Sequence, residues 1–114
     1  MVNNAALARL SKLGGDELVV KMIDLFLTHA EPKVADLRSG FVAGNLAEVE
    51  RLAHSVRSSA GNLGAEELGE LAGEVEQLAA EGEHSKLVFF ITQMENAFVR
   101  VKARLETERK GRAS

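Results

Sequence analysis

The chain has 114 residues and a net charge of −3; hydrophobic residues make up 46% of it and aromatic residues 4%. This length allows one domain with a single modest core, and the hydrophobic share is too high for a disordered chain. The absence of cysteine excludes disulfides and thiolate zinc sites, and no segment concentrates basic residues as a nucleic-acid-binding surface would.

Apolar residues recur at helical spacing along nearly the whole chain. A short first helix is predicted over residues 3–13, ending at Gly14-Gly15. A long second helix follows to about residue 40, with Asp16 as its N-cap. Pro32 predicts a kink or an interruption inside the second helix. The buried positions predicted for these helices are Ala5, Leu7, Leu10, Leu13, Val19, Met22, Ile23, Phe26, Ala30, Val34, Leu37 and Phe41.

The third predicted helix opens with a capping box of Asn45 and Glu48 and closes at Leu63-Gly64, where glycine suits a left-handed C-terminal position. A fourth helix spans about 65–81. A fifth begins after a cap at Ser85 and runs to about 108, and the charged tail from about 107 is predicted to fray. The buried positions predicted here are Leu46, Val49, Leu52, Ala53, Val56, Ala60, Leu68, Leu71, Ala72, Val75, Leu78, Ala79, Leu87, Phe90, Ile91, Met94, Phe98, Val101 and Leu105.

The pattern contains no repeat, linker or second domain, so residues 1–114 are predicted to form a single all-α domain. Four longer helices joined by short turns predict an antiparallel up-down-up-down four-helix bundle, with the short N-terminal helix packed over one end. The N-terminus lacks the features of a signal peptide, and no apolar run approaches the roughly 20 residues of a membrane span. We therefore expect a cytoplasmic protein, acting as a monomer without membrane or nucleic-acid partners.

His54 is predicted to face outward, because around the third helix it lies about 100° from Ala53 and about 200° from Val56. Arg57, one turn on, can reach an anion held at the imidazole. The residues that follow are small, and they leave room for another protein to approach. The plain alternatives are a solvated Arg57 paired with Glu50, and a helix end that frays before Gly64.

The stretch that contains this histidine, "AHSVRSSAGNLGA" at residues 53–65, closely resembles the signature of histidine-containing phosphotransfer (HPt) domains of two-component phosphorelays. That signature usually reads A-H-x-L-K-[GS]-[SA]-[SA]-x-x-[LIV]-G-[AL]. Arg57 stands in place of the common lysine, and Val56 in place of leucine. The resemblance extends over residues 26–68, which have the family's spacing of helix, proline, turn and histidine helix, and members of the family are four-helix bundles of about this length.

The resemblance implies that His54 accepts a phosphoryl group from an aspartyl phosphate on a receiver domain and passes it to an aspartate on another receiver. A neutral imidazole nitrogen is a competent nucleophile near neutral pH, and an exposed one can enter a partner's active site. Arg57 would contact the phosphoryl oxygens as the family's lysine does, and Ser58 could donate a hydrogen bond to them. The chain itself would need no cofactor, because the resemblance implies that the receiver brings Mg²⁺. The sequence also lacks the clustered ligands of a metal site.

The fourth predicted helix should place residues 73–77 level with His54, and Gly69 and Gly73 would let it approach closely. Glu76 and Gln77 are then predicted to lie near enough to touch the imidazole from the side. Members of the family often carry a glutamine 22 residues after the histidine, where this chain has Glu76 followed by Gln77. A carboxylate there could fix the proton on Nδ1 and leave Nε2 as the nucleophile. It would also repel a phosphoryl group, and the plain alternative is one more solvated charge on an acidic helix.

The predicted docking surface centres on His54 and extends to the second helix around Pro32. It includes Glu50, Arg51, Ser55, Ser58, Gly61 and Asn62. His29 is predicted to be a half-buried packing residue, and His84 to lie in a turn.

Three alternatives to a stand-alone carrier are compatible with a helical bundle of this kind or with its histidine. A kinase's ATP-binding domain could phosphorylate the chain directly, as in chemotaxis kinases. A non-catalytic helical adaptor could use the same surface only for binding, although it would not need the histidine. The dimerisation region of a sensor kinase is disfavoured, since Ser55 and Ser59 replace the glutamate and proline of its H-E-x-x-x-P motif. Without a nucleotide-binding loop, no kinase activity of its own is expected.

Overall fold

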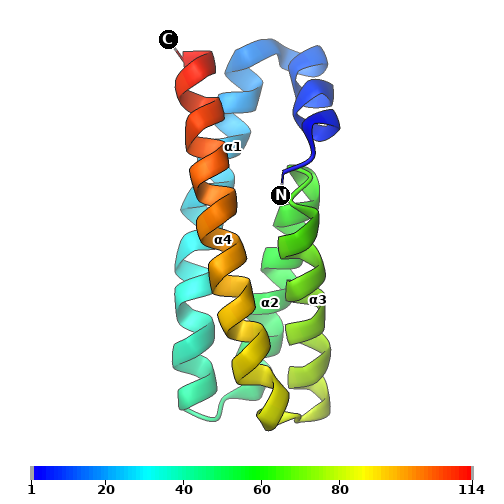
Figure 1. Ribbon diagram of the computed structural model, residues 1–114, viewed down its shortest axis with the longest axis vertical. Coiled ribbons are helices and arrows are strands. Elements are labelled where there is room, and N and C mark those ends of the chain that lie inside the picture. Colours follow the sequence, from blue (N-terminus) through cyan, green and yellow to red (C-terminus); the bar gives the residue numbers. More distant parts are fainter. Residues whose placement is uncertain (1, 114) are drawn as a thin grey trace.

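The computed structural model describes residues 2–113, which form four helices: α1 (Asn4–Val42), α2 (Leu46–Asn62), α3 (Glu66–Glu81) and α4 (His84–Ala113). Figure 1 shows an elongated bundle in which each helix runs opposite to the one before it. Contacts join α1 to α2, α2 to α3, α3 to α4 and α4 back to α1, which encloses a single core. The predicted all-α fold is confirmed. Within residues 2–113, no helix is both long and apolar enough to cross a membrane.

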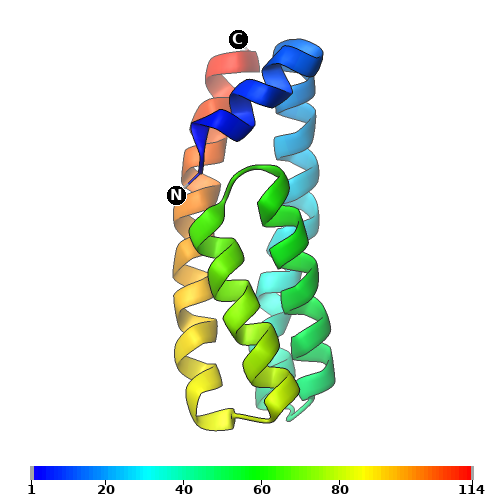
Figure 2. The same cartoon turned by 90° about the vertical axis from the view of Figure 1, so that its right-hand side faces the viewer.

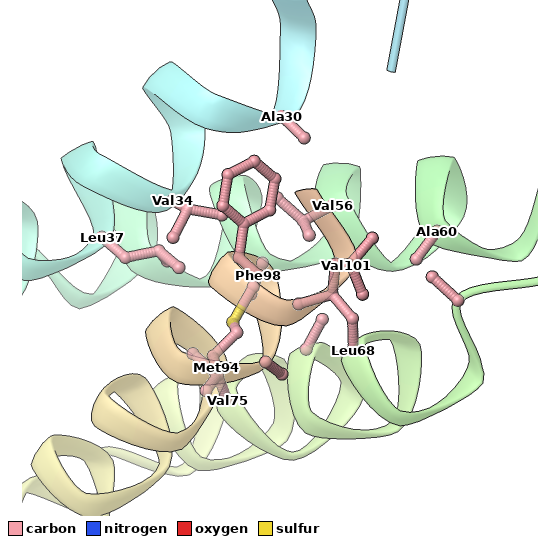
Figure 3. Close-up of a cluster of buried hydrophobic side chains, with 14 of the residues drawn as sticks. Ala30, Val34, Leu37, Val56, Ala60, Leu68, Val75, Met94, Phe98 and Val101 are labelled. Carbon is pink, nitrogen blue, oxygen red and sulfur yellow. The ribbon is translucent and has the colours of Figure 1, made fainter. Parts of the chain in front are cut away.

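The core is built from apolar side chains of all four helices (Figure 3). Val34 of α1, Val56 of α2, Val75 of α3 and Phe98 of α4 are all buried. Met94 has no exposed surface. Most of the predicted buried positions lie in this core or pack against it. Ala5 and Leu13 are wrong predictions: both are exposed, Leu13 by 75%, because the N-terminal segment turns its other face to the bundle.

The backbone of α1 leaves helical dihedral angles at Gly15 (φ 71°, ψ −165°), and the chain changes direction there. Figure 2 shows the segment before Gly15 lying across the end of the bundle above the α2–α3 turn. Asp16, predicted as an N-cap, follows this break, and its carboxylate accepts a hydrogen bond from Arg112 of α4 at 2.9 Å. By contrast, α1 continues through Pro32 without an interruption. Pro32 is exposed, so water can satisfy the carbonyl that lacks its helical donor.

The N-terminal segment is fastened to the turn that ends the histidine helix. The amide of Asn3 donates to the Gly64 carbonyl at 2.7 Å, and its side-chain amide donates to Glu66 at 2.7 Å. Gly64 has φ 67°, the left-handed conformation predicted from the sequence. A Cβ atom at Gly64 would lie 2.7 Å from the Cβ of Asn3 and 2.9 Å from that of Ala6. The close approach of the two segments therefore requires glycine.

The C-terminal tail is helical as far as Ala113, which corrects the prediction of fraying from about residue 107. The side chain of Glu108 accepts hydrogen bonds from Arg104 at 2.5 Å and from Arg112 at 3.0 Å. Because Arg112 also reaches Asp16, the last turns of α4 are braced against α1. The helix also starts one residue earlier than its predicted cap, at His84, whose ring centroid lies 6.2 Å from that of Phe41.

Candidate functional site

His54 lies in the middle of α2, on the face opposite the core. Its neighbours Ala53 and Val56 are fully buried, whereas 63% of the His54 side chain is exposed. Asn45 accepts a hydrogen bond from the Glu48 amide and caps the start of α2, and Gly64 ends the turn after it. The outward position predicted from helical spacing is the one that the structure shows.

Glu76 of α3 holds one side of the imidazole. Its Oε2 atom lies 2.8 Å from Nδ1 of His54, within hydrogen-bonding distance. The Glu76 side chain is only 20% exposed, because it lies against the flank of α2. The register across the short α2–α3 turn thus brings together two residues separated by 22 positions.

Arg57 binds the other oxygen of the same carboxylate. Its Nη1 atom donates to Glu76 Oε1 at 3.1 Å, so Arg57 pairs with Glu76 and the alternative of a pair with Glu50 is not what the structure shows. A Cβ atom at Gly73 would lie 3.7 Å from Cδ of Arg57 and 3.8 Å from its Nε. Gly73 therefore leaves the surface of α3 bare where the arginine crosses it.

The charge on Glu76 determines which imidazole nitrogen is free. Burial alone would raise the pKa of this carboxyl, but the hydrogen bonds from His54 and Arg57 outweigh that effect and lower its pKa. Glu76 is therefore ionised at neutral pH and can only accept hydrogen bonds. With Nδ1 as the donor to this carboxylate, the neutral ring keeps its lone pair on Nε2, the nitrogen on the far side of the ring.

Gln77 and Arg51 have partners other than the histidine. Gln77 was predicted together with Glu76 as a residue that touches the imidazole, but its side-chain amide donates to Glu81 at 3.2 Å. Arg51 forms an ion pair with Glu48 at 2.5 Å.

The small residues beyond the histidine leave its surroundings open. Ser58, Gly61 and Asn62 are exposed and Glu50 is half-buried. A Cβ atom at Gly61 would have no neighbour within 4 Å, so the surface beyond His54 and Arg57 is open on that side.

Lys33 is a residue that the sequence reasoning missed. It follows Pro32 on α1, and its Nζ donates to the hydroxyl of Ser55, next to His54, at 2.7 Å. Lys33 also borders a hollow of about 270 Å³ between α1 and α2, which Phe26 and Asn62 line as well. His29 lines this hollow too and is exposed, which corrects its prediction as a half-buried residue. Lys33 could have been predicted from its neighbour, because Pro32 was expected to lie opposite His54 and Lys33 is the next residue.

The exposed face of α2 that carries His54 lies between two depressions, which differ in size and in the side chains that line them. The α1 side has the hollow with Lys33, whereas the α3 side has a groove of about 940 Å³ lined by Arg57, Gly73 and several glutamates. Among residues 2–113, no three His, Asp or Glu side chains converge as a metal site would require. The site is thus an exposed imidazole whose Nδ1 is hydrogen-bonded to Glu76, with Arg57 on the α3 side and Lys33 on the α1 side.

A family model described as "Hpt domain" matches residues 21–107, a range that includes His54, Arg57 and Glu76. Among solved structures, histidine-containing phosphotransfer protein B (HptB) from Pseudomonas aeruginosa PAO1 superposes with a TM-score of 0.89 at 29% sequence identity, covering 96% of this chain and 94% of that one. A rice protein provisionally described as a histidine-containing phosphotransfer protein superposes with a TM-score of 0.86, covering 98% and 81% of the two chains. Its 15% identity supports similarity of fold alone. A search of curated proteins found no match to the sequence.

Proposed function

The chain belongs to the Hpt domain family of histidine phosphotransfer proteins in phosphorelays, and on that premise we propose that His54 is its phosphoacceptor. The observation that carries the proposal is the exposed imidazole whose Nδ1 lies 2.8 Å from the Glu76 carboxylate. This contact presents the Nε2 lone pair to solvent and to any partner that covers the site. His29 and His84 are exposed as well, but neither has a carboxylate partner of this kind among the contacts of the described residues.

The proposed step is an in-line displacement at phosphorus. The Nε2 lone pair of His54 forms the N–P bond, while the bond from phosphorus to the aspartyl oxygen of the donor breaks and its electron pair stays on the donor carboxylate. Donation to the next aspartate is the same step in reverse. No proton has to leave the ring during either step, because Nδ1 already donates its proton to Glu76.

Arg57 is proposed to stabilise the phosphoryl group. It binds Glu76, the carboxylate that also holds His54, so its guanidinium lies beside the imidazole, and 57% of its side chain is exposed. A guanidinium has five N–H donors, so it can keep a bond to Glu76 and present others to phosphoryl oxygens. It would offset part of the charge of about −2 that a phosphoryl group brings to the site.

The proposed partners are receiver domains of response regulators or hybrid histidine kinases. The docking surface comprises the exposed ridge of α2 from Glu50 to Asn62 together with Lys33 on α1. The small residues Ser58 and Gly61 give clearance to a partner's backbone, and Arg57 and Lys33 face the acidic pocket that holds an acceptor aspartate. We expect the receiver to supply Mg²⁺. We also infer that the chain acts in the cytoplasm as a monomeric up-down-up-down bundle with its short N-terminal helix across one end.

The test is to incubate the protein with phosphorylated receivers and to follow its intact mass. One added phosphate is expected, labile in acid and stable in base, and it should be absent from His54→Gln. The matched control is His84→Gln, which removes another exposed histidine and should still be phosphorylated. Phosphorylation of His54→Gln at the wild-type level would refute the assignment of the site. Binding of receivers without transfer would favour the adaptor, and labelling only by a kinase's ATP-binding domain would favour the chemotaxis type.

A further inference from the structure

We propose, building on the phosphoryl transfer described above, that Glu76 keeps the proton on Nδ1 while His54 carries the phosphoryl group, so that the ring departs from phosphorus as a neutral imidazole. Glu76 then orients the ring, and it also assists the step in which His54 donates the phosphoryl group to the next aspartate. It acts through His54 and does not touch the phosphoryl group, so it is a positioning residue.

The chemistry of the phosphorylated ring is the reason that this proton matters. When Nε2 bonds to phosphorus and Nδ1 keeps its proton, the ring becomes cationic. If an aspartate then attacks, the N–P bond breaks, its electron pair returns to Nε2, and neutral imidazole leaves with the Nδ1 proton in place. If Nδ1 has lost its proton, the same step must expel an imidazolide anion, which is a far poorer leaving group. Retention of the Nδ1 proton therefore controls how readily His54 donates.

The geometry around Nδ1 suits a carboxylate that holds this proton without removing it. Oε2 of Glu76 accepts from Nδ1 at 2.8 Å, and this charge-assisted bond joins two ionised partners once the ring is cationic. Arg57 donates to Oε1 at 3.1 Å, and the two hydrogen bonds together lower the pKa of Glu76 in spite of its burial. A carboxylate with a lowered pKa is a weak base, so the proton stays on nitrogen. Arg57 thus helps Glu76 to leave the proton on Nδ1, both before and after His54 is phosphorylated.

Few other charges face the ring. On α2, Arg51 is paired with Glu48, and Glu50 is half-buried one turn before the histidine. On α1, the Lys33 ammonium is bound to Ser55, and His29 lines the same hollow as Lys33. On α3, Glu74 is exposed two residues before Glu76, and the backbone of α4 does not come close to that of α2. Of the carboxylates on α3, Glu76 is therefore the one placed to bond Nδ1.

The experiment compares wild type with Glu76→Gln, and uses Glu74→Gln as the matched control. Both substitutions remove one negative charge from α3, but Glu74 does not bond the imidazole. A glutamine at position 76 can still accept from Nδ1 through its amide oxygen, so ring orientation is preserved. The proteins are phosphorylated chemically with phosphoramidate, which requires no kinase. The Nδ1 proton is then followed by ¹⁵N NMR as the pH is raised, and single-turnover transfer to one receiver is timed over the same range.

In Glu76→Gln the phosphorylated ring should lose its Nδ1 proton about one pH unit lower than in wild type, since an opposite charge at this distance has been removed. Transfer should be equal in the two proteins at low pH and about tenfold slower in the variant at high pH. Glu74→Gln should follow wild type throughout. Because each comparison uses the same receiver, the receiver's own pH dependence cancels.

Two results would overturn the inference. Slowing of Glu76→Gln by the same factor at every pH would mean that Glu76 only orients the ring. An unchanged Nδ1 titration would mean that Glu76 does not hold the proton. A wild-type protein that takes no phosphate on His54 would instead refute the proposed function, so the two failures are distinguishable.

Discussion

Gly64 should be the glycine of the α2–α3 region at which alanine is least tolerated. Its φ of 67° lies in the left-handed region, which costs an alanine about 1–2 kcal/mol. An added Cβ would also lie 2.7 Å from the Cβ of Asn3 and 2.9 Å from that of Ala6, closer than carbon atoms pack. Both are Cβ atoms next to the backbone, so the N-terminal segment must move as a whole.

That movement would disturb the 2.7 Å hydrogen bond from Asn3 to the Gly64 carbonyl and the burial of Leu7, which is only 2% exposed. Overpacking of this kind typically costs about 1–3 kcal/mol. The free energy of unfolding of Gly64→Ala should therefore fall by about 2–5 kcal/mol in total. Such a loss is a large fraction of the stability of a small domain.

The assay is urea unfolding followed by circular dichroism, with Gly82→Ala as the control. Gly82 has φ 73°, but a Cβ there would have no neighbour within 4 Å. Gly82→Ala should therefore lose only the conformational cost of about 1–2 kcal/mol. The difference between the variants measures the contact with the N-terminal segment. If Gly64→Ala unfolds at the same urea concentration as Gly82→Ala, with equal m-values, the argument from close packing is refuted.

Three further predictions concern the core, the carboxylate and the docking surface. Met94→Ala, which empties a fully buried site, should lower the free energy of unfolding by about 2–5 kcal/mol in the same urea assay, and an effect below about 1 kcal/mol would contradict the packing in Figure 3. Because the folded-state pKa of Glu76 is lowered, its ionised form contributes stability that is complete above the unfolded pKa and is lost as the pH falls through the folded pKa. The stability difference between wild type and Glu76→Gln should therefore shrink as the pH falls below about 5, and a constant difference would refute the direction of the pKa shift. Gly61→Phe should leave chemical phosphorylation by phosphoramidate unchanged but slow transfer from a receiver, and equal slowing of both would exclude a role in partner clearance.

The histidine helix and its carboxylate could be predicted from the sequence because their signals are local. Asn45 and Gly64 mark the two ends of α2, and a short turn leaves little freedom in the register of α3. Once that register is set, the glutamate 22 residues beyond His54 must lie near it. The pairing of Arg57 with Glu76, rather than with Glu50, needed the structure, because a long side chain can reach several partners from one backbone position.

The features that the sequence did not predict depend on side chains far apart in the chain. The last turns of α4 are charged and small, which locally favours fraying. They are held by Arg112, whose partner Asp16 is 96 positions away. The bond between Lys33 and Ser55 likewise joins α1 to α2, and no periodic pattern marks either residue. Local propensity can therefore place the helices, but not the polar contacts that lock one helix against another.

Arg57 and Glu76, two positions at which the chain departs from the usual HPt pattern, form a single unit in the structure. A glutamate in place of the common glutamine puts a charge at a position that is only 20% exposed, where an unpaired carboxylate would be costly. A guanidinium in place of the lysine ammonium can bind that carboxylate with one N–H and retain other donors for a phosphoryl group. Gly73 has no side chain, so the Arg57 side chain can cross the surface of α3 to reach Glu76. The glutamate adds a negative charge beside His54, whereas the arginine keeps the charge of the lysine and adds N–H donors, so the two together keep Glu76 ionised, Nδ1 protonated and Nε2 free.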